Sequence, residues 1–194
     1  MAKSSYHHGD LKSAILAQAA ELVAERGADG VSLRELARAA GVSHAAPAHH
    51  FTDRRGLFTA LAAQGWRMLA EALAGSGPDF LHAASAYVHF ALDHPGHYEV
   101  MFDKSLIDEA DVELREAKAA AGAELSRGVG TLTDARSRSD PDAAALAAWS
   151  LVHGFVMLRL NDLIATEGDP LAQIERAATM LFGGEPRAVA SGHD

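Results

Sequence analysis

The stretch from Ser32 to Phe51 constrains the fold more than any other part of this sequence, because it reads as two short helices joined by a tight turn. Ser32 can cap the first helix, and Glu35 three residues later completes a capping box. Apolar residues then recur at helical spacing until Gly41, where the first helix must end. Ser43 can cap the second helix. The pattern is typical of a helix-turn-helix, a motif whose second helix can enter the DNA major groove.

The remainder of the sequence favours helices throughout, so we expect an all-α fold. The 194 residues include six prolines and no cysteine, and we find no strand pattern longer than chance. The absence of cysteine excludes disulfides and thiolate metal sites. Breaks are expected at 75–78, 94–96 and 137–141, the last of them as a loop. Apolar spacing and capping residues predict helices over residues 11–26, 54–73, 79–93, 97–102, 110–129, 142–166 and 171–182.

The charge distribution separates the first 55 residues from the rest of the chain. The whole sequence has a net charge of -9, yet its first 55 residues contain seven Lys and Arg against six Asp and Glu. The remaining residues therefore contain 10 basic and 20 acidic side chains. This contrast suggests that one end of the molecule can approach phosphate while the rest is repelled. An ordinary acidic protein could show the same charge distribution, so the argument for DNA binding depends on the helix-turn-helix motif.

Several motifs resemble the TetR (tetracycline repressor) family. They run through residues 6–66: Tyr-His-His-Gly-Asp-Leu at 6–11, Gly27, Ser-Leu-Arg-Glu-Leu-Ala at 32–37, Gly-Val-Ser at 41–43 and His-Phe at 50–51, followed by Arg54 and Leu57. Ala-Trp-Ser-Leu-Val-His-Gly at 148–154 is similar to the Trp-His-Gly signature of one C-terminal subgroup, and residues 94–102 fit that subgroup too.

The resemblance implies a role for each part of the chain. It implies a three-helix helix-turn-helix DNA-binding domain at 1–55, a connecting helix at 56–75, a helical-bundle domain for ligand binding and dimerisation at 76–183, and a disordered tail at 184–194. It further implies a homodimer that represses transcription from a palindromic double-stranded operator. A small effector molecule, which we expect to be apolar, would release the DNA. No cofactor is expected.

The resemblance places the recognition helix at residues 43–50. It implies contacts from base-facing residues, from two serines at helix N-termini that favour phosphate, and from the basic residue that opens the next helix. The predicted DNA-binding residues are Ser32, Ser43, His44, Ala45, Ala46, Ala48, His49, His50 and Arg54. Family members usually have a tyrosine that contacts phosphate where this chain has Ala48. We therefore expect Ala48→Tyr to tighten operator binding in a gel-shift titration, and unchanged or weaker binding would refute this.

Two further sets of residues are assigned to the body. Aromatic and polar residues suit an apolar pocket with a few polar groups, and the predicted ligand-binding residues are Tyr87, Phe90, Tyr98, Phe102, Trp149, His153, Met157 and Asn161. Residues 142–166 are apolar on two sides, which predicts contacts with the chain's own core and with a twin subunit. The predicted dimer interface contains Phe155, Leu158, Asp162, Leu171, Ile174, Ala178 and Leu181. The alternative is burial within one chain.

Metal binding and catalysis are weighed against these assignments. Adjacent His49 and His50 point about 100° apart on a helix and cannot easily share one ion. His89, Asp93 and His97 could share a face, but a solvated or capping role is commoner, so no metal is predicted. Paired carboxylates, a phosphate loop and a nucleophile signature are missing, so no enzyme is predicted. The rival hypothesis is an all-helical small-molecule- or metal-binding protein whose helix-turn-helix serves protein contacts.

The sequence predicts a cytoplasmic, nucleoid-associated protein. No apolar run follows the first charged residues, so we expect no signal peptide. We also expect no stretch that is long and charge-free enough to span a membrane.

Overall fold

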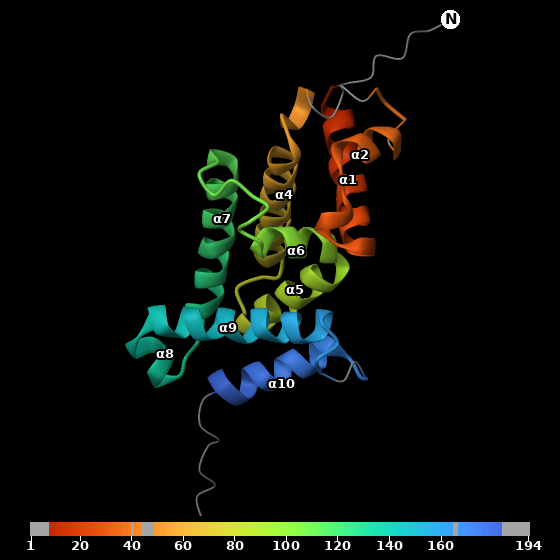
Figure 1. Cartoon of the computed structure of the whole chain (residues 1–194). Coiled ribbons are helices and arrows are strands. Elements are labelled where there is room, and N and C mark those ends of the chain that lie inside the picture. Colours follow the sequence, from red (N-terminus) through yellow and green to blue (C-terminus); the bar gives the residue numbers. More distant parts are fainter. Residues whose placement is uncertain (1–7, 40, 44–48, 165–166, 184–194) are drawn as a thin grey trace, which may run out of the picture. The chain divides into compact units, whose positions relative to one another are not determined.

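The chain is helical in all the parts that the structure describes, as the sequence predicts (Figure 1). This computed structural model describes residues 8–39, 41–43, 49–164 and 167–183. Within these ranges there is no strand, so the expected all-α class is confirmed. The helices are α1 His8–Arg26, the 3-10 helix η1 Ala28–Gly30, α2 Leu33–Ala39, α4 Arg54–Gly75, α5 Phe80–Asp93, α6 Pro95–Phe102, α7 Val112–Val129, α8 Ala135–Ser139, α9 Pro141–Leu160 and α10 Pro170–Phe182.

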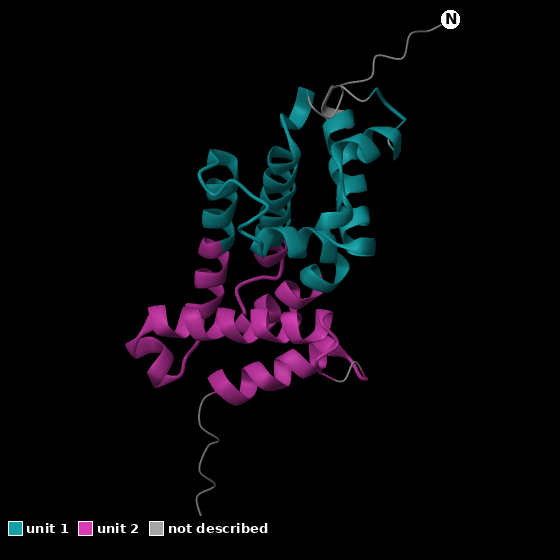
Figure 2. Ribbon diagram, in the orientation of Figure 1, with its two compact units in different colours: residues 1–71, 90–121 teal, residues 72–89, 122–194 magenta. Residues whose placement is uncertain are grey.

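The helices form two compact units, each assembled from two separate stretches of the chain. The first unit contains residues 1–71 and 90–121, and the second contains residues 72–89 and 122–194 (Figure 2). Helices α4, α5 and α7 each contribute residues to both units. These are units of packing, and the functional division at residues 55 and 75 stays a prediction. The predicted disordered tail at 184–194 lies outside the described residues.

The first unit is built around apolar side chains from α1, α2 and α4. Ile15 of α1, Leu36 of α2 and Phe58 of α4 are completely buried. Helix α6 packs along α1. The approach is close, because a Cβ atom at Gly96 of α6 would collide with the carbonyl oxygen of Ala20. The apolar faces that the sequence predicts for α1 and α2 therefore meet in one core.

Several helix ends are capped as their sequence allows, although α1 begins at His8 and not at the predicted residue 11. Asp53 Oδ1 accepts a hydrogen bond from Gly56 N at 2.7 Å, which caps α4. Asp79 Oδ1 likewise accepts bonds from two first-turn amides of α5, at 2.9 and 3.2 Å. Gly27 and Gly41 have φ angles of 76° and 65°, in the left-handed region that glycine enters without strain. Each of them ends a helix at the expected position.

The second unit has its own small core beneath α9 and α10. Its buried residues are Phe80, Val129, Ala144, Ala148 and Ala178. The rings of Phe80 and Phe182 pack edge to face with centroids 5.0 Å apart. Small alanine side chains on α9 and α10 let these two helices approach each other in the core.

Two expected breaks are wrong in their details. Residues 137–141 were expected to form a loop, but they belong to α8 and to the first turn of α9. Asp134 Oδ1 accepts from Ser137 N at 3.0 Å, and Asp140 Oδ1 accepts from Ala143 N at 3.0 Å, so two caps in succession hold the segment. Helix α6 begins at Pro95 and not at residue 97, because proline suits the first helical position.

Helix α9 corrects two further expectations. It ends at Leu160, and not near residue 166, because Asp162 has a left-handed φ of 54° and Leu163 N bonds back to Leu158 O at 2.9 Å. It is also long and apolar enough to cross a membrane by length and composition alone, with a mean hydropathy of 1.5. The expectation that no such stretch exists is therefore wrong. A single helix of this kind is weak evidence for a membrane span.

Candidate nucleic-acid interface

The first helix of the predicted helix-turn-helix begins with the expected cap. Ser32 Oγ accepts a hydrogen bond from Glu35 N at 3.2 Å. The Glu35 carboxylate lies 2.8 Å from Arg26 at the end of α1 and 3.9 Å from Arg38 on α2. The acidic residue therefore ties the start of α2 to the end of α1, in addition to any favourable interaction with the helix dipole.

The turn of the motif also has the predicted form. Val42 N donates to Ala37 O at 3.0 Å, and Gly41 N donates to Arg38 O at 3.2 Å. None of the described residues comes within 4 Å of a Cβ built on Gly41, and its positive φ is by itself a reason for glycine. Val42 is half-buried, as expected of a residue that fills the gap between the helices.

The segment after the turn is described only in part. Ser43 and His49 are exposed, and His50 is half-buried with its ring 6.1 Å from that of Phe51. Phe51 is only 4% exposed and anchors the segment in the core. Four other predicted DNA-binding residues lie outside the described residues: His44, Ala45, Ala46 and Ala48.

Two exposed arginines on α2 were missed by the sequence reasoning. Arg34 and Arg38 lie four residues apart, so they share one side of the helix. The side chain of Arg38 is 78% exposed. Basic residues at this spacing on the polar face of α2 were the signal that could have identified them.

Arg54, predicted to contact phosphate, points its guanidinium group at the turn between α1 and α2. Its Nη2 donates to Ala28 O at 2.8 Å and its Nε donates to Val31 O at 3.2 Å. Asp29 Oδ1 lies 3.6 Å from Nη2, and the guanidinium carbon lies 4.7 Å from the centre of the Phe58 ring. The phosphate contact stays a prediction, whereas the contacts with the turn are part of the fold.

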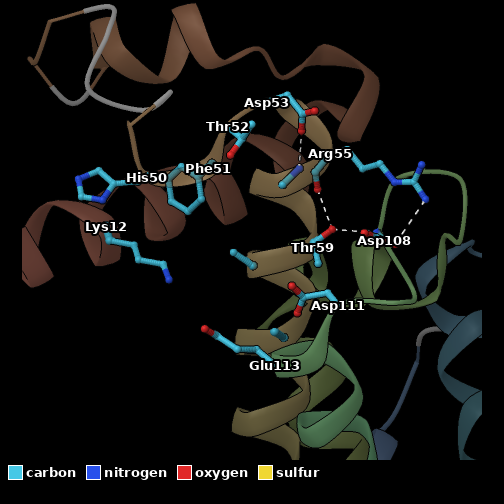
Figure 3. Close-up of a pocket in the computed structure, with 13 residues that line it drawn as sticks. Lys12, His50, Phe51, Thr52, Asp53, Arg55, Thr59, Asp108, Asp111 and Glu113 are labelled. Carbon is cyan, nitrogen blue, oxygen red and sulfur yellow. Dashed lines mark hydrogen bonds and ion pairs between the residues drawn. The ribbon is translucent and has the colours of Figure 1, made fainter.

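A cleft of about 350 Å³ lies within the first unit beside Phe51 and the start of α4 (Figure 3). The buried Thr59 hydroxyl donates to the Arg55 carbonyl and accepts from Asp108 N, both at 2.8 Å. Arg55 Nε and Nη2 donate to Ile107 O at 3.2 and 2.9 Å. No sequence pattern indicates this attachment. The cleft is lined by Lys12, His50, Phe51, Thr52, Asp53, Arg55, Gly56, Thr59, Ala60, Ala63, Asp108, Asp111 and Glu113.

Some of the predicted ligand-binding residues lie together in the first unit. The rings of Tyr98 and Phe102 are 4.8 Å apart, and Trp66 packs edge to face on Phe102 at 5.2 Å. Phe90 is 5% exposed, with its ring 5.3 Å from that of His94. Trp66 Nε1 is buried and has no hydrogen-bond partner in the part of the chain that the structure describes. Trp66 is not among the predicted ligand-binding residues, so this donor was missed.

The other predicted ligand-binding residues lie in the second unit. Tyr87 is completely buried, and its hydroxyl lies 3.4 Å from His153 Nδ1. The Trp149 ring is 5.9 Å from that of His153, and burial lowers the pKa of His153. Met157 and Asn161 are exposed, and Asn161 Nδ2 donates to Met157 O at 2.8 Å at the end of α9. The predicted set therefore forms two clusters, one in each unit.

The predicted interface residues differ in their exposure. Ile174 and Ala178 are completely buried within the single chain, so they belong to its core. Leu158 and Leu181 are 41% and 52% exposed. Phe155 and Leu171 are half-buried, and Asp162 is exposed.

An exposed apolar surface on α9 and α10 includes Leu181 of that predicted set together with residues outside it. The α9 residues of this surface are spaced by three, eight and three residues, which places them on one side of the helix, and α10 adds the most exposed of them all, Met180, at 85%. We call this surface the α9–α10 stripe; it contains Leu146, Trp149, Met157, Leu160, Met180 and Leu181. Large exposed apolar residues gathered on two helices that pack together are typical of a contact with another molecule.

His97, considered above with His89 and Asp93 as a possible metal ligand, is buried, at 7% exposure. Its Nε2 lies 3.1 Å from Gln64 Oε1 of α4. Burial, together with the nearby charge of His94, lowers its pKa to about 4. Within the described ranges, no group of three or more His, Asp or Glu side chains is arranged to hold a metal ion.

Comparison with known families gives two matches. Residues 15–61 match the family described as bacterial regulatory proteins, tetR family. Residues 80–181 match the family described as tetracyclin repressor-like, C-terminal domain. The two matches cover the helix-turn-helix and most of the later helices. No protein of curated function matches the sequence.

Solved structures share the fold over nearly the whole chain. A protein of unknown function from Rhodococcus sp. RHA1 is 34% identical over 93% of this chain and 97% of its own, with a TM-score of 0.72. A bacterial regulatory protein of the tetR family from Rhodococcus RHA1 is 21% identical over 91% and 98%, with a TM-score of 0.69. NalD, the secondary repressor of the MexAB-OprM multidrug efflux pump in Pseudomonas aeruginosa, is 23% identical over 91% and 95%, with a TM-score of 0.60.

Proposed function

This chain belongs to the TetR family of bacterial regulatory proteins, which are DNA-binding transcriptional regulators, and on that premise we propose that it is a ligand-responsive repressor. In this proposal a homodimer binds a palindromic operator in the cytoplasm, without catalysing a reaction, and a small molecule releases the DNA. The observation that carries the proposal is the helix-turn-helix, with α2 capped by Ser32, the left-handed turn at Gly41 and the buried anchor Phe51.

The proposed DNA contacts combine helix ends with exposed side chains. Ser32 and Ser43 are exposed, and amides at helix N-termini favour a phosphate there. His49 is exposed at the end of the recognition segment, and we add Arg34 and Arg38 of α2 as phosphate contacts. Two heads of one dimer would then read half-sites about 34–36 Å apart.

The proposed dimer forms through the α9–α10 stripe. Single scattered apolar residues need no explanation, but this stripe places six large ones on two helices that pack together. Four helices, two from each subunit, can bury it as a bundle. Such burial also explains why α9 is apolar enough to resemble a membrane span, so no membrane is needed.

The proposed effector is small and largely apolar, and it carries a hydrogen-bond acceptor. The aromatic rings of Tyr98 and Phe102 support the apolar part. The buried Trp66 Nε1 supports the acceptor, because a buried donor without a partner costs about 1–3 kcal/mol that a ligand oxygen could recover. Release would need the ligand to favour one arrangement of the dimer over another, by about 1–3 kcal/mol in typical cases.

The test is binding of the full-length protein to DNA from its own upstream region, measured by fluorescence anisotropy across a salt series. We expect tight binding that survives excess random DNA and weakens steeply with salt. Gly41→Val should abolish it, because a β-branched residue cannot readily adopt the positive φ of the turn. Gly122→Ala, in an open helical position, is the matched control. Salt-insensitive binding, or binding that Gly41→Val leaves intact, would contradict the proposal.

A further inference from the structure

Arg54 and Arg55, the first two residues of α4, point their guanidinium groups at different parts of the first unit. Arg54 binds the turn between α1 and α2, through the carbonyl oxygens of Ala28 and Val31. Arg55 binds the connection after α6, through the carbonyl oxygen of Ile107. Both arginines lie in the first turn of α4, and each binds backbone carbonyls of another segment of the chain.

The turn that Arg54 binds is also held from α6. Ala28 N donates to Glu99 Oε1 at 2.8 Å, while Ala28 O accepts from Arg54 Nη2 at the same distance. Ala28 is thus held at its amide by the Glu99 carboxylate and at its carbonyl by the Arg54 guanidinium group. Hydrogen bonds that involve an ionised partner are roughly twice as strong as neutral ones. Ala28 is 5% exposed, so water competes little for either bond.

Ala28 lies at a point in the chain from which it can set the position of the DNA-binding helices. It belongs to η1, which directly precedes Ser32 and α2. The end of α1 is fixed there as well, because Gly27 takes a positive φ and Gly27 N bonds to Val23 O at 2.8 Å. Holding Ala28 therefore fixes where α2 begins relative to α1, α4 and α6.

A second attachment joins α4 to the segment that follows α6. The Thr59 hydroxyl accepts from Asp108 N and donates to the Arg55 carbonyl, both at 2.8 Å (Figure 3). Thr59 is 5% exposed, so water competes little with the two hydrogen bonds of its hydroxyl. The segment that follows α6 is thereby attached to the same first turns of α4 as the α1–α2 turn.

We propose that Arg54 and Glu99 are positioning residues for DNA recognition, which hold Ala28 and so fix α2 and its helix-turn-helix on α4 and α6. The inference rests on the proposed function as a DNA-binding repressor. In it Arg54 acts through the fold and makes no phosphate contact. The geometry favours this role, since the guanidinium group already has two carbonyls, Asp29 and the Phe58 ring around it. These contacts hold the guanidinium group against the turn between α1 and α2.

The salt dependence of operator binding separates the two roles. A lost phosphate contact in each head of a dimer would make the slope of log K against log salt shallower by about 1.8. Loss of positioning weakens binding at every salt concentration and leaves the slope unchanged. We therefore expect Arg54→Met to bind about tenfold more weakly with the wild-type slope. A slope shallower by about 1.8 would overturn the inference.

Three further variants keep the test decisive if Arg54→Met does not fold. Arg54→Lys keeps the charge but lacks the fork that reaches two carbonyls, so a positioning role predicts weak binding and a phosphate role predicts recovery. Glu99→Met removes the acceptor for Ala28 N and should weaken binding about tenfold, although it removes a negative charge. Glu99→Gln keeps an acceptor and should bind like wild type. Tight binding by Arg54→Lys or Glu99→Met would overturn the inference.

Hydrogen exchange gives a measurement that needs no DNA. In Arg54→Lys and Glu99→Met, amides of residues 28–39 should exchange faster, while those of α7 should match the wild type. Unchanged exchange at 28–39 would also overturn the inference. If the wild-type protein fails to bind its upstream DNA but exchange responds as expected, the proposed function fails while the positioning of the head by Ala28 stands.

Discussion

The burial of His97 makes a quantitative prediction about stability and pH. Its ring is 7% exposed, and in the neutral form with the proton on Nε2 it can donate to Gln64 Oε1 at 3.1 Å. Loss of hydration, and then the charge of His94, lowers its pKa from 6.5 to about 4. Protonation of this buried ring would therefore oppose the folded state.

The sign and size follow from proton linkage. Between pH 6.5 and 4 the unfolded chain binds a proton at His97 that the folded chain does not, so stability falls as the pH falls. Above pH 6.5 the contribution is fully present. A shift from 6.5 to about 4 corresponds to at most about 3 kcal/mol, of which about 2 kcal/mol is lost by pH 5.

The assay is urea unfolding at pH 7.5 and pH 5, at one protein concentration, for the wild type and His97→Gln. The glutamine amide can still donate to Gln64 but does not titrate. Because carboxylates titrate equally in both proteins, the difference between the two proteins isolates His97. We expect that difference to change by about 2 kcal/mol between the two pH values, in favour of the variant at pH 5. The same pH dependence in both proteins would refute the assignment of a buried, neutral His97.

Three more predictions concern packing and association. Gly96→Ala should destabilise the fold by about 3 kcal/mol in thermal or urea unfolding, because its Cβ collides with the backbone of Ala20. The control Gly122→Ala, in open space on α7, should stabilise the fold by about 1 kcal/mol. Equal effects of the two substitutions would contradict the close packing of α6 on α1. Asp140→Ala should cost about 1 kcal/mol through loss of the α9 cap, and an unchanged unfolding midpoint would exclude that cap. Leu181→Glu should yield monomers in analytical ultracentrifugation, and an intact dimer would exclude the α9–α10 stripe as its interface.

The parts of the fold that sequence reasoning predicted well depend on local chemistry. Asp53 caps α4 because a short carboxylate reaches the amide three residues on, whatever surrounds it. Gly27 and Gly41 end helices because only their own backbone must turn left-handed. The same reasoning could have found α8, where Asp134 caps Ser137, but a cluster of serine, aspartate and proline was taken as a loop.

The direction of side chains was harder to predict, because it depends on contacts that are distant in the sequence. Arg54 lies next to the recognition segment in sequence, yet its partners at residues 28–31 come from the turn before α2. Apolar spacing on α10 could not tell which face meets α9. Ile174 and Ala178 face the core, whereas Met180 and Leu181 face outward. Only the packing of α9 against α10 decides between them.

Holding Arg54 and Arg55 on carbonyls changes what can bind the DNA. Among the described residues of the first 55, α2 presents Arg34 and Arg38 as exposed cations, with Arg38 3.9 Å from Glu35. Arg26 is paired with Glu35 at 2.8 Å, and Lys12 lines the cleft beside Phe51. Phosphate recognition must then rely more on helix N-termini, whose attraction for an anion falls off within the first turn. A surface with many mobile cations tolerates displacement of a helix, but a helix end does not. On the proposed function, accurate placement of α2 by the contacts at Ala28 would take over part of the role that additional charge otherwise has.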